Sequence, residues 1–205
     1  MNYPKFYDGV ETIRVKDQLS AVLGAFAGGE YEFTYLDIVK SAGHSCPTVA
    51  GAYLITLEGL KALYPDTLAM RGDVKVEFKE SLEEGVAGVI GNVVSQITGA
   101  TDKSGFKGLA GKFARHSLMD FDANIDSNIR LTRVDNGKSV DVFYNPSAVM
   151  PNPEMQPLMQ KMMSGQANMQ EMQAFGKLWQ DRVKRIFENS ASIITVAEVQ
   201  SPFLL

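Results

Sequence analysis

Residues 47–64, PTVAGAYLITLEGLKALY, carry the strongest structural signal in the chain. Apolar side chains recur there at helical spacing on one face: Val49, Ala52, Tyr53, Leu57, Leu60 and Leu63. Pro47 suits the first helical position, because the amide hydrogen that proline lacks is not needed there. The stretch therefore predicts a core helix.

Two further helices are predicted before this core helix. Apolar side chains recur at spacings of three and four in residues 15–26: Val15, Leu19, Val22, Leu23 and Phe26. This pattern predicts a buried helical stripe that ends at Gly28 and Gly29. Thr34 followed three residues later by Asp37 is the pattern of a capping box, so a short helix is expected to begin there and to end at Gly43.

After the core helix, the pattern alternates between strand and helix. Residues 73–80 alternate apolar and charged side chains, which predicts a strand with one buried face. A helix is expected within the glycine-rich residues 88–114, and a strand at 115–122. Two alternating runs meet at Asn136 and Gly137, a dipeptide that favours a tight hairpin.

The composition changes near residue 150, after which methionine is frequent. Residues 153–190 predict two helices broken near Ser164 and Gly165, and residues 191–199 predict a final strand. We therefore expect an α+β fold, with mixed helices, an antiparallel sheet core and a Met-rich helical hairpin near the C-terminus. Residues 1–150 would form the core, and residues 151–205 would pack on it or on a dimer partner.

Charge and cysteine content limit the possible partners and compartment. The 205 residues include 20 Lys and Arg against 24 Asp and Glu, so the net charge of −4 does not favour nucleic acid or an anionic membrane. No segment approaches the roughly 20 apolar residues needed to cross a bilayer. The single cysteine cannot form an internal disulfide, which favours a reducing compartment, so we expect a cytoplasmic protein.

The segment GHSCP, residues 43–47, holds that cysteine and one of the two histidines. Cys46 would precede the core helix, where free amides and the helix dipole favour a thiolate. His44 lies two positions earlier in an expected extended loop, so both side chains can point the same way and share a ligand. In the alternative interpretation, Cys46 is a buried apolar residue and His44 caps the preceding helix. His116 is either a third ligand or an ordinary surface residue.

With SQITGATDKSGFKG, residues 95–108, this segment resembles the formylmethanofuran dehydrogenase E-subunit family and its free-standing bacterial relatives. The first family motif is matched by Gly43, His44, Cys46 and Pro47, and the second by Thr98, Gly99 and Thr101. The likeness covers roughly residues 32–145. It implies an α+β core, a homodimer, and a metal ion, zinc most often, near the His-Cys pair. The resemblance associates the dehydrogenase reaction with other proteins of that enzyme complex.

The sequence also departs from the family pattern. Ala42 stands where relatives often have a histidine, Ala100 where the second motif has its cysteine, and Asn92 where an aspartate is usual. The cysteine-rich zinc ribbon that closes some members is replaced by the methionine-rich segment. The resemblance therefore implies a reduced site in which His44 and Cys46 bind a transition metal, zinc or iron, with His116 or a carboxylate to complete the shell.

Two other functions remain open at the same residues. Cys46 followed by proline, together with the methionines between Met150 and Met172, would suit a haem-binding or haem-handling protein. A metal- or cysteine-dependent hydrolase would use metal-bound water, or Cys46 with His116 as its base. Whether the protein is an enzyme is left open by the sequence. The methionine face itself is typical of a pliable packing surface, in the core or between two chains.

Overall fold

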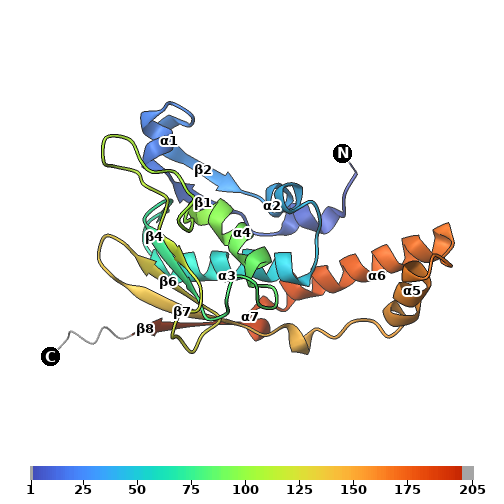
Figure 1. Ribbon diagram of the computed structural model, residues 1–205. Helices are drawn as coiled ribbons and strands as arrows, with labels where there is room; N and C mark the ends of the chain where they lie inside the picture. The colour runs from blue at the N-terminus through green and yellow to red at the C-terminus, as the bar shows by residue number, and fades with distance from the viewer. Residues whose placement is uncertain (1, 200–205) are drawn as a thin grey trace.

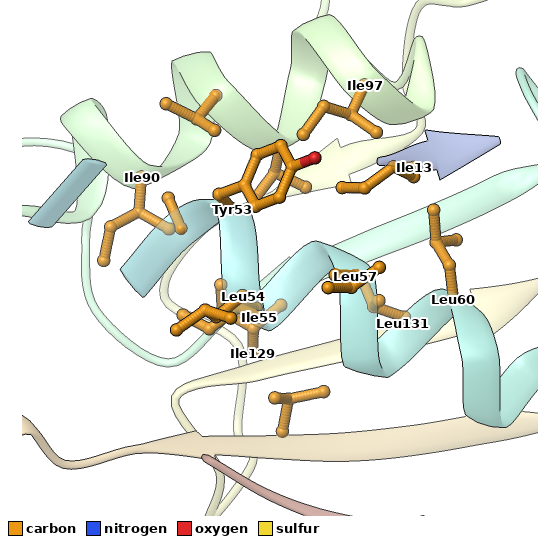
Figure 2. Close-up of a cluster of buried hydrophobic side chains, with 14 of the residues drawn as sticks. Ile13, Tyr53, Leu54, Ile55, Leu57, Leu60, Ile90, Ile97, Ile129 and Leu131 are labelled. Atoms are coloured by element: carbon orange, nitrogen blue, oxygen red, sulfur yellow. The ribbon is translucent and has the colours of Figure 1, made fainter. Parts of the chain in front are cut away.

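Figure 1 shows the computed structural model, which describes residues 2–199. The predicted core helix is α3 (Pro47–Leu63), and it lies across the middle of the molecule. Its residues 49–57 are all buried, so the helix is enclosed on every side and not on the single predicted face. Figure 2 shows Tyr53 on the side of α3 that faces α4, with Ile129 and Leu131 on the opposite side. A helix that is apolar all round belongs in a core.

A five-stranded sheet covers one side of α3. Its strand order is β5 (Met119–Asp120), β4 (Val74–Phe78), β6 (Ile129–Arg133), β7 (Ser139–Tyr144) and β8 (Ile194–Val199). The pairs β4–β6, β6–β7 and β7–β8 are antiparallel, whereas β5 runs parallel to β4. The predicted strand at 73–80 and the predicted hairpin are both confirmed.

Two of these strand predictions needed adjustment. Among the residues that join β6 to β7 only Gly137 has a positive φ, of 73°, so the connection is wider than a tight two-residue turn. The final strand begins at Ile194, because the preceding residues form the short helix α7 (Ser190–Ile193).

A three-stranded sheet, in the order β2-β1-β3, lies on the other side of the molecule. It contains β1 (Ile13–Lys16), β2 (Glu30–Phe33) and β3 (Ala69–Met70). The predicted helical stripe over residues 15–26 is wrong. Val15 lies in β1, α1 spans only Gln18–Val22, and Leu23 is 64% exposed. Asp17 caps α1 and thereby separates the strand from the helix.

The remaining helices pack around α3. As predicted, α2 (Tyr35–Ala42) begins with the Thr34 capping box and ends at Gly43, whose φ is 76°. The helix α4 (Ala87–Thr98) lies along α3, with Ile90 and Ile97 among the core residues that Figure 2 shows. Short 3-10 turns occur at Lys5–Gly9, Ala27–Gly29 and Pro146–Ala148.

The predicted methionine-rich hairpin is also present. It consists of α5 (Met155–Met163) and α6 (Met169–Glu188), which are antiparallel neighbours. The C-terminal half of α6 packs against α3, while α5 and the start of α6 extend away from the body in Figure 1. The α+β class is confirmed. No helix within residues 2–199 has the length and apolar character to span a bilayer.

Candidate metal and ligand site

The GHSCP segment connects α2 to α3 beside α6 (Figure 1). Gly43 ends α2 in the left-handed conformation, and its amide donates to the Val39 carbonyl. Pro47 is the first residue of α3, so only the four residues from Gly43 to Cys46 lie between the two helices. Both helix ends therefore fix this short loop.

Ser45 holds the loop in the interior. Its hydroxyl lies 2.9 Å from the Tyr35 hydroxyl, and the residue is only 8% exposed. Its carbonyl accepts hydrogen bonds from Trp179 Nε1 at 2.9 Å and from Gln180 Nε2 at 3.2 Å. Sequence reasoning treated Trp179 only as part of an apolar helical stripe and missed this role. Because α6 is far away in sequence, no local pattern signals the contact.

Cys46 occupies the predicted position immediately before α3. Its backbone is extended, and Sγ accepts a hydrogen bond from the Val49 amide at 3.4 Å. The residue is half-buried. Burial raises the pKa of the neighbouring Tyr144 to about 12, and Cys46 adds to this rise against the opposing effect of Arg182. Tyr144 therefore remains a neutral phenol, and it donates to the Pro47 carbonyl at 2.9 Å.

His44 is exposed, and within residues 2–199 only one of its two ring nitrogens has a hydrogen-bond partner. Its Nδ1 lies 3.0 Å from the Ala42 carbonyl oxygen, which can only accept a hydrogen bond. This contact favours the tautomer with the proton on Nδ1, which leaves the Nε2 lone pair available to a ligand.

A cavity of about 390 Å³ opens beside His44, between the end of α2 and α4. Asn92 and Gln96 from α4 line it, together with Ala42. Two of the departures from the family pattern, Ala42 and Asn92, therefore lie in this one cavity. A methyl group and a neutral amide stand there in place of an imidazole and a carboxylate, so the cavity has fewer strong metal donors than the resemblance implies.

His116 does not line this cavity. It lies in the loop that follows α4, where Nδ1 is 3.0 Å from the Ser117 hydroxyl and the backbone amide donates to the Phe106 carbonyl. Within residues 2–199, no group of three or more His, Cys, Asp or Glu side chains is placed to hold a metal ion. Cys46 does not line the cavity beside His44 either. A metal shared by His44 and Cys46 therefore stays a prediction, as does the role of His116.

The residues of the second motif stabilise the end of α4 and the following loop. The Thr98 hydroxyl donates to the Val94 carbonyl at 2.7 Å and accepts from the Ala100 amide. Gly99 ends the helix with a φ of 76°. Thr101 donates to the Arg115 carbonyl, and Ala100 is fully buried. The methyl group of Ala100 therefore fills a core position where the resemblance expects a cysteine.

The chain matches the model of a known protein family. The family model described as "FmdE, Molybdenum formylmethanofuran dehydrogenase operon" matches residues 42–196, which include the GHSCP segment, α4 and the methionine-rich hairpin. No curated protein matches the chain.

Proposed function

The chain belongs to the FmdE family, and from that premise we propose that it binds one transition-metal ion, zinc or iron, through His44 Nε2 and Cys46 Sγ. Imidazole and thiolate are both ligands that zinc and iron accept. The observation that carries the proposal is the anchored loop. Ser45 is fixed by Tyr35, Trp179 and Gln180. The backbone positions of its neighbours His44 and Cys46 are therefore fixed relative to each other.

The remaining coordination positions would be filled by water or a small ligand. Asn92 and Gln96 offer amide oxygens in the cavity beside His44, but these are weaker donors than the carboxylate that the resemblance expects. When bound, such an ion would supply Lewis-acid chemistry. The protein would contribute the fixed pair of donors and the cavity. A free thiol ligand also favours a cytoplasmic, reducing location.

Metal analysis of the purified, untagged protein tests this proposal. We expect about one zinc or iron per chain in the wild type and in the control His116→Ala, and loss of that metal in His44→Ala and in Cys46→Ser. Circular dichroism would show that both variants remain folded. Retention of the metal in both variants, or a wild type that binds neither added zinc nor added ferrous iron, would refute the proposal. A Soret band that Cys46→Ser lacks would make haem the ligand instead.

We also propose that two copies associate through the methionine-rich hairpin. Four of its methionines are exposed, three of them by 45% or more: Met159, Met163, Met169 and Met172. Met150, shortly before the hairpin, is exposed as well. Methionine is unbranched and polarizable, which suits adaptable contact surfaces. The extension of the hairpin from the body leaves this surface accessible to a second chain (Figure 1).

A further inference from the structure

A second cavity, of about 240 Å³, lies at the start of α3. Its apolar walls come from α3, β4, α4 and β6 and from the residue before α4: Ile55, Phe78, Val86, Ala87, Ile90 and Ile129. Figure 2 labels three of these, Ile55, Ile90 and Ile129. The cavity includes Pro47 and Thr48 but not His44, so it is separate from the cavity described above.

The side chains that line this cavity are packed in the core, so they cannot easily move inward and fill the cavity. Ile55 is fully buried, and Phe78 is 2% exposed. Phe78 also stacks on Phe121, with ring centroids 4.7 Å apart and an interplanar angle of 16°. Tyr144 forms another wall, and its ring lies so close to Gly51 that a Cβ there would collide with it. The space is thus part of the packed architecture.

The volume and lining of the cavity indicate an apolar ligand of about the size of one aromatic ring. A cavity of roughly 150 Å³ lined by Leu, Ile and Phe binds benzene in another protein. The larger space here admits one aromatic ring with a short polar extension. Ligand sites of this kind combine apolar walls with a few polar groups that fix orientation.

One carboxylate gives the cavity a charge preference. Glu80 lines it and is half-buried. None of the ion pairs within residues 2–199 includes Glu80. The adjacent Lys79 directs its ammonium group to the Asp126 carbonyl. Glu83 and Glu84 follow in the same segment and are exposed. Among the described residues that line the cavity, only Glu80 carries a charge, and its carboxylate favours a cationic group over an anionic one.

We propose that this cavity binds a small molecule with an aromatic or branched apolar body and a primary ammonium group. The body occupies the space between Ile55, Ile90 and Ile129, and the ammonium group lies near Glu80. The site needs no metal at Cys46, so it goes beyond the function proposed above.

Calorimetric titration with three probes of similar shape tests the proposal: benzylamine, benzyl alcohol and benzoate. We expect benzylamine to bind about two- to fivefold more tightly than benzyl alcohol, as for a partly exposed charge pair, and benzoate to bind least. Ile90→Phe should abolish binding of all three by filling the cavity. Glu80→Gln should remove the preference for benzylamine, whereas the control Glu83→Gln should keep it.

Cys46→Ser separates this proposal from the metal site. We expect it to bind benzylamine with wild-type affinity even though it loses the metal. The proposal is overturned if the wild type binds none of the probes, or if binding persists in Ile90→Phe. Benzoate binding as tightly as benzylamine would also overturn it.

Discussion

Two glycines allow α3 to lie very close to the five-stranded sheet. A Cβ at Gly59 would collide with Leu131 Cδ1, and a Cβ at Gly51 would collide with the ring of Tyr144. Glycine usually weakens a helix interior by roughly 0.5–1 kcal/mol relative to alanine. Here the close contact between the helix and the sheet compensates for that cost.

We predict that Gly59→Ala lowers the free energy of unfolding by about 1–3 kcal/mol, because the new methyl group overpacks the contact with Leu131. The matched control is Gly176→Ala in α6, where a Cβ would meet nothing within 4 Å. That variant should be more stable than the wild type by about 0.5–1 kcal/mol. Urea denaturation measures the free energy of unfolding of both variants. Equal changes in that free energy at the two sites would contradict the close-packing explanation.

Cys46 has a structural role that is independent of any metal. Because Sγ accepts from the Val49 amide, it satisfies one of the free amides at the start of α3. We predict that Cys46→Ala lowers the free energy of unfolding by about 1 kcal/mol in metal-free protein, whereas Cys46→Ser keeps an acceptor and loses less. Urea denaturation in the presence of EDTA distinguishes them. Equal stability of the two variants would show that the sulfur contact does not stabilise the helix.

At the scale of elements, Asp17 joins the start of α1 to two distant segments. Its carboxylate accepts from the Leu19 and Ser20 amides, from Arg71 at 3.0 Å and from Arg115 at 2.7 Å. Arg71 follows β3, and Arg115 lies in the loop after α4. The small sheet, α1 and that loop therefore share one buried ionic cluster.

The Asp17 cluster makes stability depend on pH. Burial opposes ionisation of Asp17, but the Ser20 amide and the guanidinium groups of Arg115 and Arg71 outweigh it and hold the pKa below its ordinary value of 3.8. A folded-state pKa below the unfolded one contributes stability that is complete above the unfolded pKa. That stability is lost as the pH falls through the folded pKa.

We predict that Asp17→Asn costs about 3–5 kcal/mol of unfolding free energy at pH 7, because Arg115 becomes a buried charge without its partner. The difference from the wild type should shrink as the pH falls below the folded pKa of Asp17, since the wild-type carboxyl is then neutral too. Urea denaturation from pH 7 to pH 2 measures this. Asp66→Asn, at an exposed site, is the control. A difference that stays constant with pH would refute the role assigned to the charge.

At the scale of the whole molecule, the methionine-rich hairpin extends from the body, and the core covers only part of it. Met155 is buried, but Met163 is 75% exposed and Met169 is 72% exposed. Lys161 and Glu171 form an ion pair that links α5 to α6. The hairpin therefore has its own internal contacts while it presents apolar side chains to solvent.

Association through the hairpin predicts a specific change in mass. We expect the wild type to sediment at twice the chain mass, and Met163→Lys with Met169→Lys to sediment as a monomer, because charged side chains disfavour an apolar interface. Val134→Lys makes the same kind of change at another exposed site and should remain a dimer. A monomeric wild type, or a double variant that stays dimeric, would contradict association through this surface.

Local signals in the sequence were enough for much of the fold. The capping box at Thr34, Pro47 at the start of α3, the alternation around Val76 and the break at Gly165 all predicted elements that the structure contains. Each signal acts through the backbone within about one turn or through a two-residue period, so it needs no distant partner. The α+β class and the methionine-rich hairpin could be inferred in this way. Family membership was expected instead from the resemblance of residues 43–47 and 95–108 to the family motifs, and the family match confirms it.

Other features depend on residues that are far apart in sequence. Val15 fits a helical stripe, yet it pairs with Tyr31 in β2 and Ala69 in β3, because strand pairing outweighs the local pattern. The sequence located the loop with His44 and Cys46 but could not show that Trp179 anchors it. It also could not reveal the cavity beside Glu80. Cavities and anchoring contacts arise where separate elements pack together, so only the folded arrangement defines them.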